Sequence, residues 1–146
     1  MLWNLYLRNG MAYVPTVAQT EAGFFIDVEP VEAVPASDAE ALQRAVKQAI
    51  NRGNPKIPTP TRATFPKPAV LKYAKVKSWS AFERDSINWT IVEKEGCYQI
   101  KRGRRRAEGG WEDDPEHIEV LPRGVELSEI AQRVVSSVQS VIDGGQ

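Results

Sequence analysis

The stretch WNLYLRNGMAYVPT, residues 3–16, carries the strongest local signal in the chain. Asn9-Gly10 lies between two runs of alternating side chains, and both residues tolerate the positive φ of a type I′ hairpin turn. This turn pairs Tyr6 with Tyr13 on one face of the hairpin. Four aliphatic side chains then fall on the other face: Leu5, Leu7, Ala12 and Val14.

Further strands are predicted along the chain. Residues 24–29, FFIDVE, alternate in polarity and indicate a third strand, near a sheet edge because prolines interrupt the residues that follow. Residues 86–103, SINWTIVEKEGCYQIKRG, predict a second hairpin that turns at residues 94–96. Residues 117–122, HIEVLP, predict one more short strand.

Helix signals lie in the middle of the chain. Ser37 and Glu40 have the spacing of a capping box, which predicts a helix that begins at Ser37 and stops at Gly53. Farther on, either Ser78 or Ser80 can cap a short helix.

A final helix is predicted over residues 125–145, VELSEIAQRVVSSVQSVIDGG, with Gly144 as its stop. Apolar side chains recur there at helical spacing and form a stripe for the core: Leu127, Ile130, Ala131, Val134, Val138, Val141 and Ile142.

Residues 54–68, NPKIPTPTRATFPKP, hold five of the ten prolines in the chain. Such a run forms neither a helix nor a central strand. We expect an ordered loop that crosses the sheet, with Ile57 and Phe65 inserted into the core.

Together these elements predict an α+β fold. A mostly antiparallel sheet of about five to six strands is covered by two main helices, and the proline-rich loop crosses it. The chain has 146 residues, a length that can bury a core without disulfides, so we expect a single domain over residues 1–146.

The formal net charge is zero, but the charges are segregated along the chain. Residues 1–43 carry one basic and six acidic side chains, and residues 44–106 carry sixteen basic and four acidic ones. Residues 107–146 carry two basic and nine acidic side chains. Either these blocks neutralise one another in the fold, or separate charged faces meet a charged partner.

Signals for catalysis are poor. Cys97 is the only cysteine, which excludes an intramolecular disulfide. His117 is the only histidine, so the other ligands of a metal site would have to be carboxylates. Cys97 lies in a strand pattern and is expected in the core. We therefore predict no enzyme activity, no metal and no cofactor. The sequence shows no secretory signal and no run of about 18 apolar residues, which predicts a cytoplasmic protein without a membrane span.

Residues 101–116, KRGRRRAEGGWEDDPE, join a basic half to an acidic half. The basic half could contact phosphate: Lys101, Arg102, Arg104, Arg105 and Arg106. With three lysines upstream and the aromatic residues between them, the segment 72–106 is a candidate nucleic-acid-binding module. The acidic half would repel phosphate, however. We expect a solvated loop with internal charge pairing, anchored in the core by Trp111.

The order of the segments resembles the immunity proteins of contact-dependent growth inhibition and related polymorphic-toxin systems in bacteria. The hairpin of residues 3–16 leads to the acidic strand FFIDVEPVE, residues 24–32. The proline-rich loop, the short helix KSWSAFE, the second hairpin, GGWEDDPE and the final helix follow. The resemblance extends over nearly the whole chain but includes no catalytic motif.

The resemblance implies a protein without catalysis that binds the C-terminal domain of a cognate toxin, most often a nuclease, and blocks its active site or substrate surface. An acidic patch would then mimic phosphate and speed association. On this hypothesis the toxin-binding residues are Trp111, Glu112, Asp113, Asp114 and Glu116, together with Asp27, Glu29 and Glu32. The nucleic-acid-binding module remains the alternative.

Overall fold

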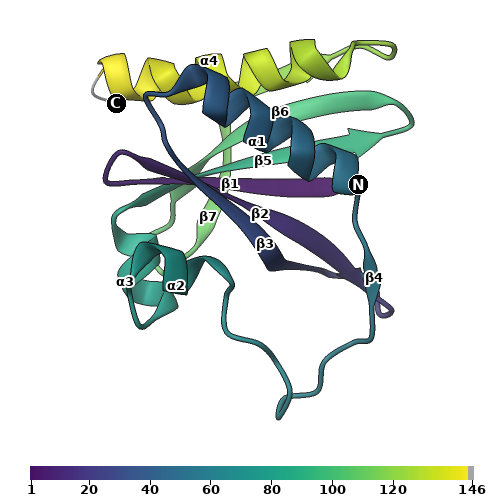
Figure 1. Cartoon of the computed structure of the whole chain (residues 1–146), viewed down its shortest axis with the longest axis vertical. Coiled ribbons are helices and arrows are strands. Elements are labelled where there is room, and N and C mark those ends of the chain that lie inside the picture. Colours follow the sequence, from purple (N-terminus) through teal and green to yellow (C-terminus); the bar gives the residue numbers. More distant parts are fainter. Residues whose placement is uncertain (145–146) are drawn as a thin grey trace.

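A computed structural model describes residues 1–144. One sheet separates two long helices on one face from two short helices on the other (Figure 1). Its strands lie in the order β3-β2-β1-β5-β6-β7, all neighbours antiparallel, and the short β4 pairs in parallel with the end of β2. The predicted α+β class is confirmed.

The strands are β1 (Leu2–Arg8), β2 (Met11–Thr20), β3 (Phe25–Pro35), β4 (Lys56–Ile57), β5 (Ser86–Lys94), β6 (Cys97–Arg105) and β7 (Trp111–Leu121). The helices are α1 (Ala39–Arg52), α2 (Val70–Ala74), α3 (Trp79–Arg84) and α4 (Leu127–Gly144).

Both predicted hairpins are present. Asn9 and Gly10 take positive φ values of 51° and 78°, and Tyr6 lies opposite Tyr13, as predicted. The second hairpin joins β5 to β6 through Glu95-Gly96, which also have positive φ. Because β1 pairs with β2 on one side and with β5 on the other, the two hairpins form the centre of the sheet.

Strand β3 lies at one edge of the sheet, as predicted. Its register on β2 shifts in the middle, since Pro15 pairs with Val31 but Thr16 pairs with Val28. Glu29 and the proline after it are therefore left out of the ladder as a bulge.

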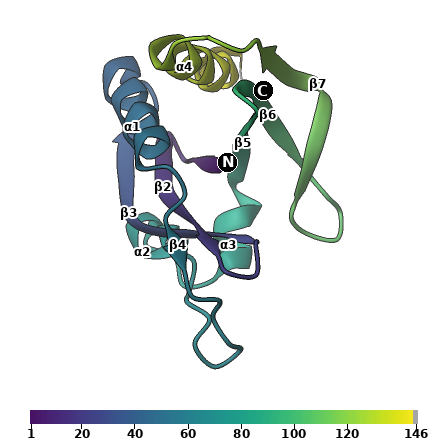
Figure 2. The same ribbon diagram turned by 90° about the vertical axis from the view of Figure 1, so that its right-hand side faces the viewer.

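Helices α1 and α4 cover one face of the sheet (Figure 2). Alternate side chains of the strands point toward them, and the largest of these, Trp3 and Trp89, are 1% and 0% exposed. The Trp89 indole donates a hydrogen bond from Nε1 to the hydroxyl of Ser137 on α4, at 2.8 Å. This helix-covered face is the main core of the protein.

The helix ends differ slightly from the prediction. Asp38, not Ser37, caps α1, because its carboxylate accepts a hydrogen bond from the backbone N–H of Ala41 at 3.1 Å. Gly53 ends α1, and Ser78 caps α3, as predicted. No helix within residues 1–144 is long and apolar enough to cross a membrane.

The stripe of α4 is buried except at its end. Ile142 was predicted to face the core but is 40% exposed, whereas Val135 is buried. Helix α4 reaches Gly144, the predicted stop, and the remainder of the predicted helix, residue 145, lies outside the described residues.

The opposite face of the sheet is covered only in part, by α2 and α3, and we call it the open face (Figure 1). Tyr6 and Tyr13 project from the sheet here and meet Phe82 edge to face, with ring centroids 5.4 and 5.8 Å away. Trp79 stacks on Phe82, and Trp111 packs edge to face against Trp79. Trp111 thus anchors its strand in a second, aromatic cluster, although it stays half-buried.

Residues 101–116 form strands and not the predicted loop. Strand β7 begins at Trp111, six residues before the predicted strand, and pairs with β6 along the charged stretch. Cross-strand ion pairs allow an acidic segment to take part in a sheet. Cys97 is also exposed rather than in the core, since it lies at the start of β6 on the uncovered part of the sheet.

The proline-rich loop departs from the prediction at Phe65. This ring is 55% exposed and stacks on Phe24, which is also exposed, with ring centroids 6.5 Å apart. Ile57 is half-buried, in the short strand β4. The loop thus runs beside the sheet without inserting Phe65 into the core.

Candidate functional site

The acidic half of residues 101–116 is bound to cations of the same hairpin. Glu112 forms an ion pair with Arg104 at 2.7 Å, and Asp113 forms one with Lys101 at 3.1 Å. Asp114 lies 2.9 Å from Nδ1 of His117. The hydrogen bond with His117 and that from the backbone of Glu116 lower the pKa of the Asp114 carboxyl.

The basic half is engaged as well. Arg105 donates from Nη1 to the backbone carbonyl of Glu83 at 3.0 Å, and its Nη2 lies 3.7 Å from the Glu83 carboxylate. Arg106 forms an ion pair with Glu108 at 2.9 Å. Arg102 is not free either, since it interacts with another group of the protein. Three ion pairs therefore join the two halves of residues 101–116, as expected, whereas Arg105 is paired with Glu83 of α3.

The second predicted acidic group lies at the opposite edge of the sheet. Asp27, Glu29 and Glu32 belong to β3, whereas residues 111–116 belong to β7 (Figure 2). The fold does not bring the two predicted acidic groups together.

Each acid on β3 also has an internal partner. Glu32 lies 3.6 Å from Arg52. Glu29, on the bulge, forms an ion pair with Lys72 at 2.6 Å and accepts a hydrogen bond from the hydroxyl of Tyr73 at 2.5 Å. These two contacts fasten α2 to β3, and they lower the pKa of the Glu29 carboxyl.

Asp27 is the most enclosed of the predicted residues. It accepts hydrogen bonds from the hydroxyl of Tyr6 at 2.5 Å and from Nδ2 of Asn4 at 2.7 Å. Burial raises the pKa of the Asp27 carboxyl, and the two hydrogen bonds offset that effect only in part.

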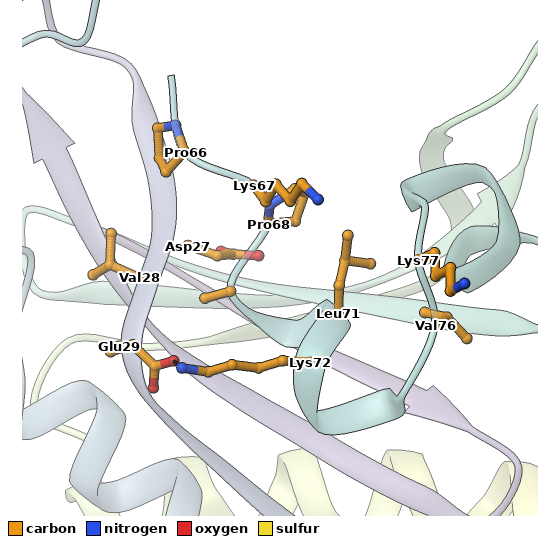
Figure 3. Close-up of a pocket in the computed structure, with 11 residues that line it drawn as sticks. Asp27, Val28, Glu29, Pro66, Lys67, Pro68, Leu71, Lys72, Val76 and Lys77 are labelled. Atoms are coloured by element: carbon orange, nitrogen blue, oxygen red, sulfur yellow. Dashed lines mark ion pairs between the residues drawn. The ribbon is translucent and has the colours of Figure 1, made fainter. Parts of the chain in front are cut away.

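Asp27 lines an open groove of about 680 Å³. Figure 3 shows its walls: β3 on one side, the end of the proline-rich loop on another, and α2 with the segment after it on the third. The lining residues are Asp27, Val28, Glu29, Pro66, Lys67, Pro68, Ala69, Leu71, Lys72, Val76 and Lys77.

A second cavity of about 390 Å³ adjoins the groove. Asp27, Pro66 and Pro68 line both cavities, so the two form one elongated depression on the open face. Phe65 and Trp79 also line the second cavity, which places the Phe24–Phe65 stack at its end. The depression offers apolar contact surface and a few charged groups, a composition suited to binding.

Two lysines of the groove stand out from the other cations. Within residues 1–144, neither Lys67 nor Lys77 has an ion-pair partner, in contrast to Lys72. Both are exposed at the rim (Figure 3). Across residues 56–84, seven basic side chains face a single acidic one, Glu83. This segment therefore has an excess of positive charge, of which Lys72 is paired with Glu29.

The sequence placed Lys77 in a basic segment and assigned Phe65 to the core, but it did not single out Lys67 or Phe24. One available signal was the doubled Phe24-Phe25, because adjacent side chains of a strand point to opposite faces and both cannot enter one core. No group of three or more histidine, cysteine or acidic residues that could hold a metal ion occurs in the described part of the chain.

No family model and no curated protein matches the sequence. Two solved structures are similar in fold. A protein of unknown function from Neisseria meningitidis, NMB0488, aligns with a TM-score of 0.64 and 14% identity, over 93% of each chain. A chain of the CdiA-CT/CdiI toxin and immunity complex from Yersinia pseudotuberculosis aligns with a TM-score of 0.60 and 12% identity, over 94% of this chain and 95% of that one.

Proposed function

We propose that this chain is an immunity protein that binds and neutralises a cognate bacterial toxin domain. The observation that carries the proposal is the fold likeness to a chain of a toxin and immunity complex, which extends over nearly the whole of both chains. The segment order of the sequence, which resembles immunity proteins of contact-dependent growth inhibition, supports the same function independently of the coordinates.

The proposed mode of action is binding without catalysis. The chain would meet the toxin domain, which we take to be a nuclease, in the cytoplasm and cover its active site or its substrate surface. The open face supports such a role, since it holds an elongated depression with apolar walls. Blocking an active site in this way needs a rigid binding surface, and the sheet with its helix-covered core supplies one.

The surface that binds the toxin is a separate question from the function. The acidic residues predicted from the sequence, Glu112–Glu116 with Trp111 and the group Asp27, Glu29 and Glu32, remain a proposal. Their internal ion pairs mean that a toxin would have to compete with existing partners. The nucleic-acid alternative has the same difficulty, because Lys101, Arg104, Arg105 and Arg106 are paired with carboxylates.

Growth rescue tests the function. The C-terminal domain of the protein encoded immediately upstream is expressed from an inducible promoter in bacteria, and survivors are counted with and without this chain. We expect the domain to stop growth and this chain to restore it. An immunity protein from an unrelated system serves as the control and should not rescue. Killing that continues at full strength in the presence of this chain would contradict the proposal.

A further inference from the structure

We propose that the groove between β3, residues 66–69 and α2 is the docking site for the toxin domain, and that it takes an extended acidic segment of the toxin with a large apolar side chain. This inference rests on the proposed function and goes beyond it, because it names the surface and the chemistry of the partner. It moves the proposed contact away from the acidic residues of β7 to a groove with a basic rim and apolar walls, which Asp27 and Glu29 also line.

The walls of the groove supply the apolar part of the argument. Val28, Leu71 and Val76 face the groove from β3, α2 and the segment after α2 (Figure 3). Two prolines, Pro66 and Pro68, and Ala69 flank them in the loop, so six of the eleven lining side chains cannot form hydrogen bonds. A partner gains most here by burying an apolar side chain.

The charge of the rim supplies the acidic part. Lys67 and Lys77 lie on different walls and are without an ion-pair partner in residues 1–144. The two acids of the groove do not neutralise them, because Glu29 is held by Lys72 and Asp27 by Tyr6 and Asn4. A segment that enters between these lysines meets two unbalanced positive charges, and a carboxylate there is favoured over a cation.

The shape of the depression favours a chain over a small molecule. The groove continues into the second cavity past Asp27, Pro66 and Pro68, and the depression is therefore long and open. At its far end Phe24 and Phe65 are 43% and 55% exposed. Exposed aromatic rings beside a groove are typical anchors of protein interfaces.

The experiment measures the affinity of the purified full chain for the purified upstream toxin domain, by calorimetry and by stopped-flow association at several salt concentrations. The first variant is Lys67→Glu with Lys77→Glu. Its matched control is Arg44→Glu with Lys47→Glu on α1, which changes the net charge equally on the helix-covered side. A third variant, Glu112→Lys with Asp113→Lys, tests the surface predicted from the sequence.

We expect the groove variant to lose about 10- to 100-fold in affinity, mostly through slower association with a weaker salt dependence. The α1 control should stay within about 3-fold of the wild type. Phe65→Ala, a change at an exposed ring that leaves the core intact, should also weaken binding. Circular dichroism and thermal unfolding confirm that each variant is folded.

Two results would overturn the inference and leave the function standing. In the first, wild-type chain and groove variant bind the toxin equally well. In the second, only the Glu112→Lys, Asp113→Lys variant loses binding, which assigns the contact to β7. If the wild type binds no toxin but binds a fluorescent oligouridine through Lys67 and Lys77, both the inference and the immunity function fail, and the groove is a nucleic-acid site.

Discussion

The two faces of the sheet use their aromatic residues in different ways. On the helix-covered face, Trp3 and Trp89 are buried beneath α1 and α4, with exposed fractions of 1% and 0%. On the open face, Trp79 and Trp111 are half-buried in the second cluster, and Trp79 borders the depression. The comparison indicates that stability comes mainly from one face, whereas the other keeps accessible surface for a partner.

Replacing one tryptophan on each face would test this division most strongly. Trp89→Ala should lower the free energy of unfolding by about 3–5 kcal/mol, because it removes a fully buried ring. Trp79→Ala should cost clearly less, since part of that ring already contacts solvent. Urea unfolding followed by circular dichroism measures both. Equal losses would mean that the open face contributes as much to stability as the covered one.

A smaller effect is expected where α3 holds the tip of the β6–β7 hairpin. Glu83 is 8% exposed and accepts a hydrogen bond from the backbone N–H of Gly110 at 2.9 Å. Glu83→Ala should lower the free energy of unfolding by about 1–3 kcal/mol, because that N–H loses its acceptor and Arg105 loses its ion-pair partner, although its hydrogen bond to the backbone carbonyl of residue 83 remains. Glu83→Gln keeps an acceptor oxygen and should lose less. If the two variants unfold at the same urea concentration, the hydrogen bond to Gly110 contributes little.

The two sheet edges should differ in the sign of their pH dependence. Burial raises the pKa of Asp27, so the folded protein binds this proton more tightly than the unfolded chain does. The free energy of unfolding therefore falls as the pH rises from about 4 toward the pKa of Asp27 in the folded protein. The pKa of Asp114 is lowered by His117, so its contribution is present at higher pH and is lost on acidification.

Asp27→Asn and Asp114→Asn remove these two contributions. The free energy of unfolding of each variant, subtracted from that of the wild type, is measured from about pH 2 to pH 7, because the Asp114 contribution changes below about pH 4 and the Asp27 contribution above it. The difference should fall with pH for Asp27→Asn and rise for Asp114→Asn. Parallel curves for the two variants would mean that Asp27 is as well solvated as Asp114.

The smallest effect is expected for the ion pair of Arg104 and Glu112. Both side chains are about half exposed, at 55% and 47%, and their charges are screened by water although they lie 2.7 Å apart. A double-mutant cycle with Arg104→Ala and Glu112→Ala should give a coupling energy of about 0–1 kcal/mol. A larger coupling would show that the charged hairpin is a structural element comparable with the core.

The centre of the fold could be predicted because its signals are local. Asn9-Gly10 and Glu95-Gly96 each set a turn that only a few residue types tolerate, and the turn then fixes the register of the strands around it. The caps at Gly53 and Ser78 are local for the same reason. Within the first hairpin, the alternation of side chains was sufficient to group Leu5, Leu7, Ala12 and Val14 on one face, which is the face that the helices cover.

The groove could not be predicted because three separate segments form it. Its position depends on the bulge at Glu29 in β3, on the path of residues 66–69 and on the docking of α2, and no local pattern encodes how they meet. The strand at Trp111 was missed for a similar reason. An acidic run containing a proline is typical of a loop, and only its pairing with the basic residues of β6 makes it a strand.

The position of the groove also has a consequence for how the protein can change over evolutionary time. Every residue that lines the groove comes from β3 or from residues 66–77, and none belongs to the cluster beneath α1 and α4. Substitutions there alter the shape and charge of the depression while the main core stays intact. The prolines keep the loop ordered in advance, which limits the entropy lost on binding. A few surface substitutions could therefore give the protein a new binding partner while its sheet and main core stay unchanged.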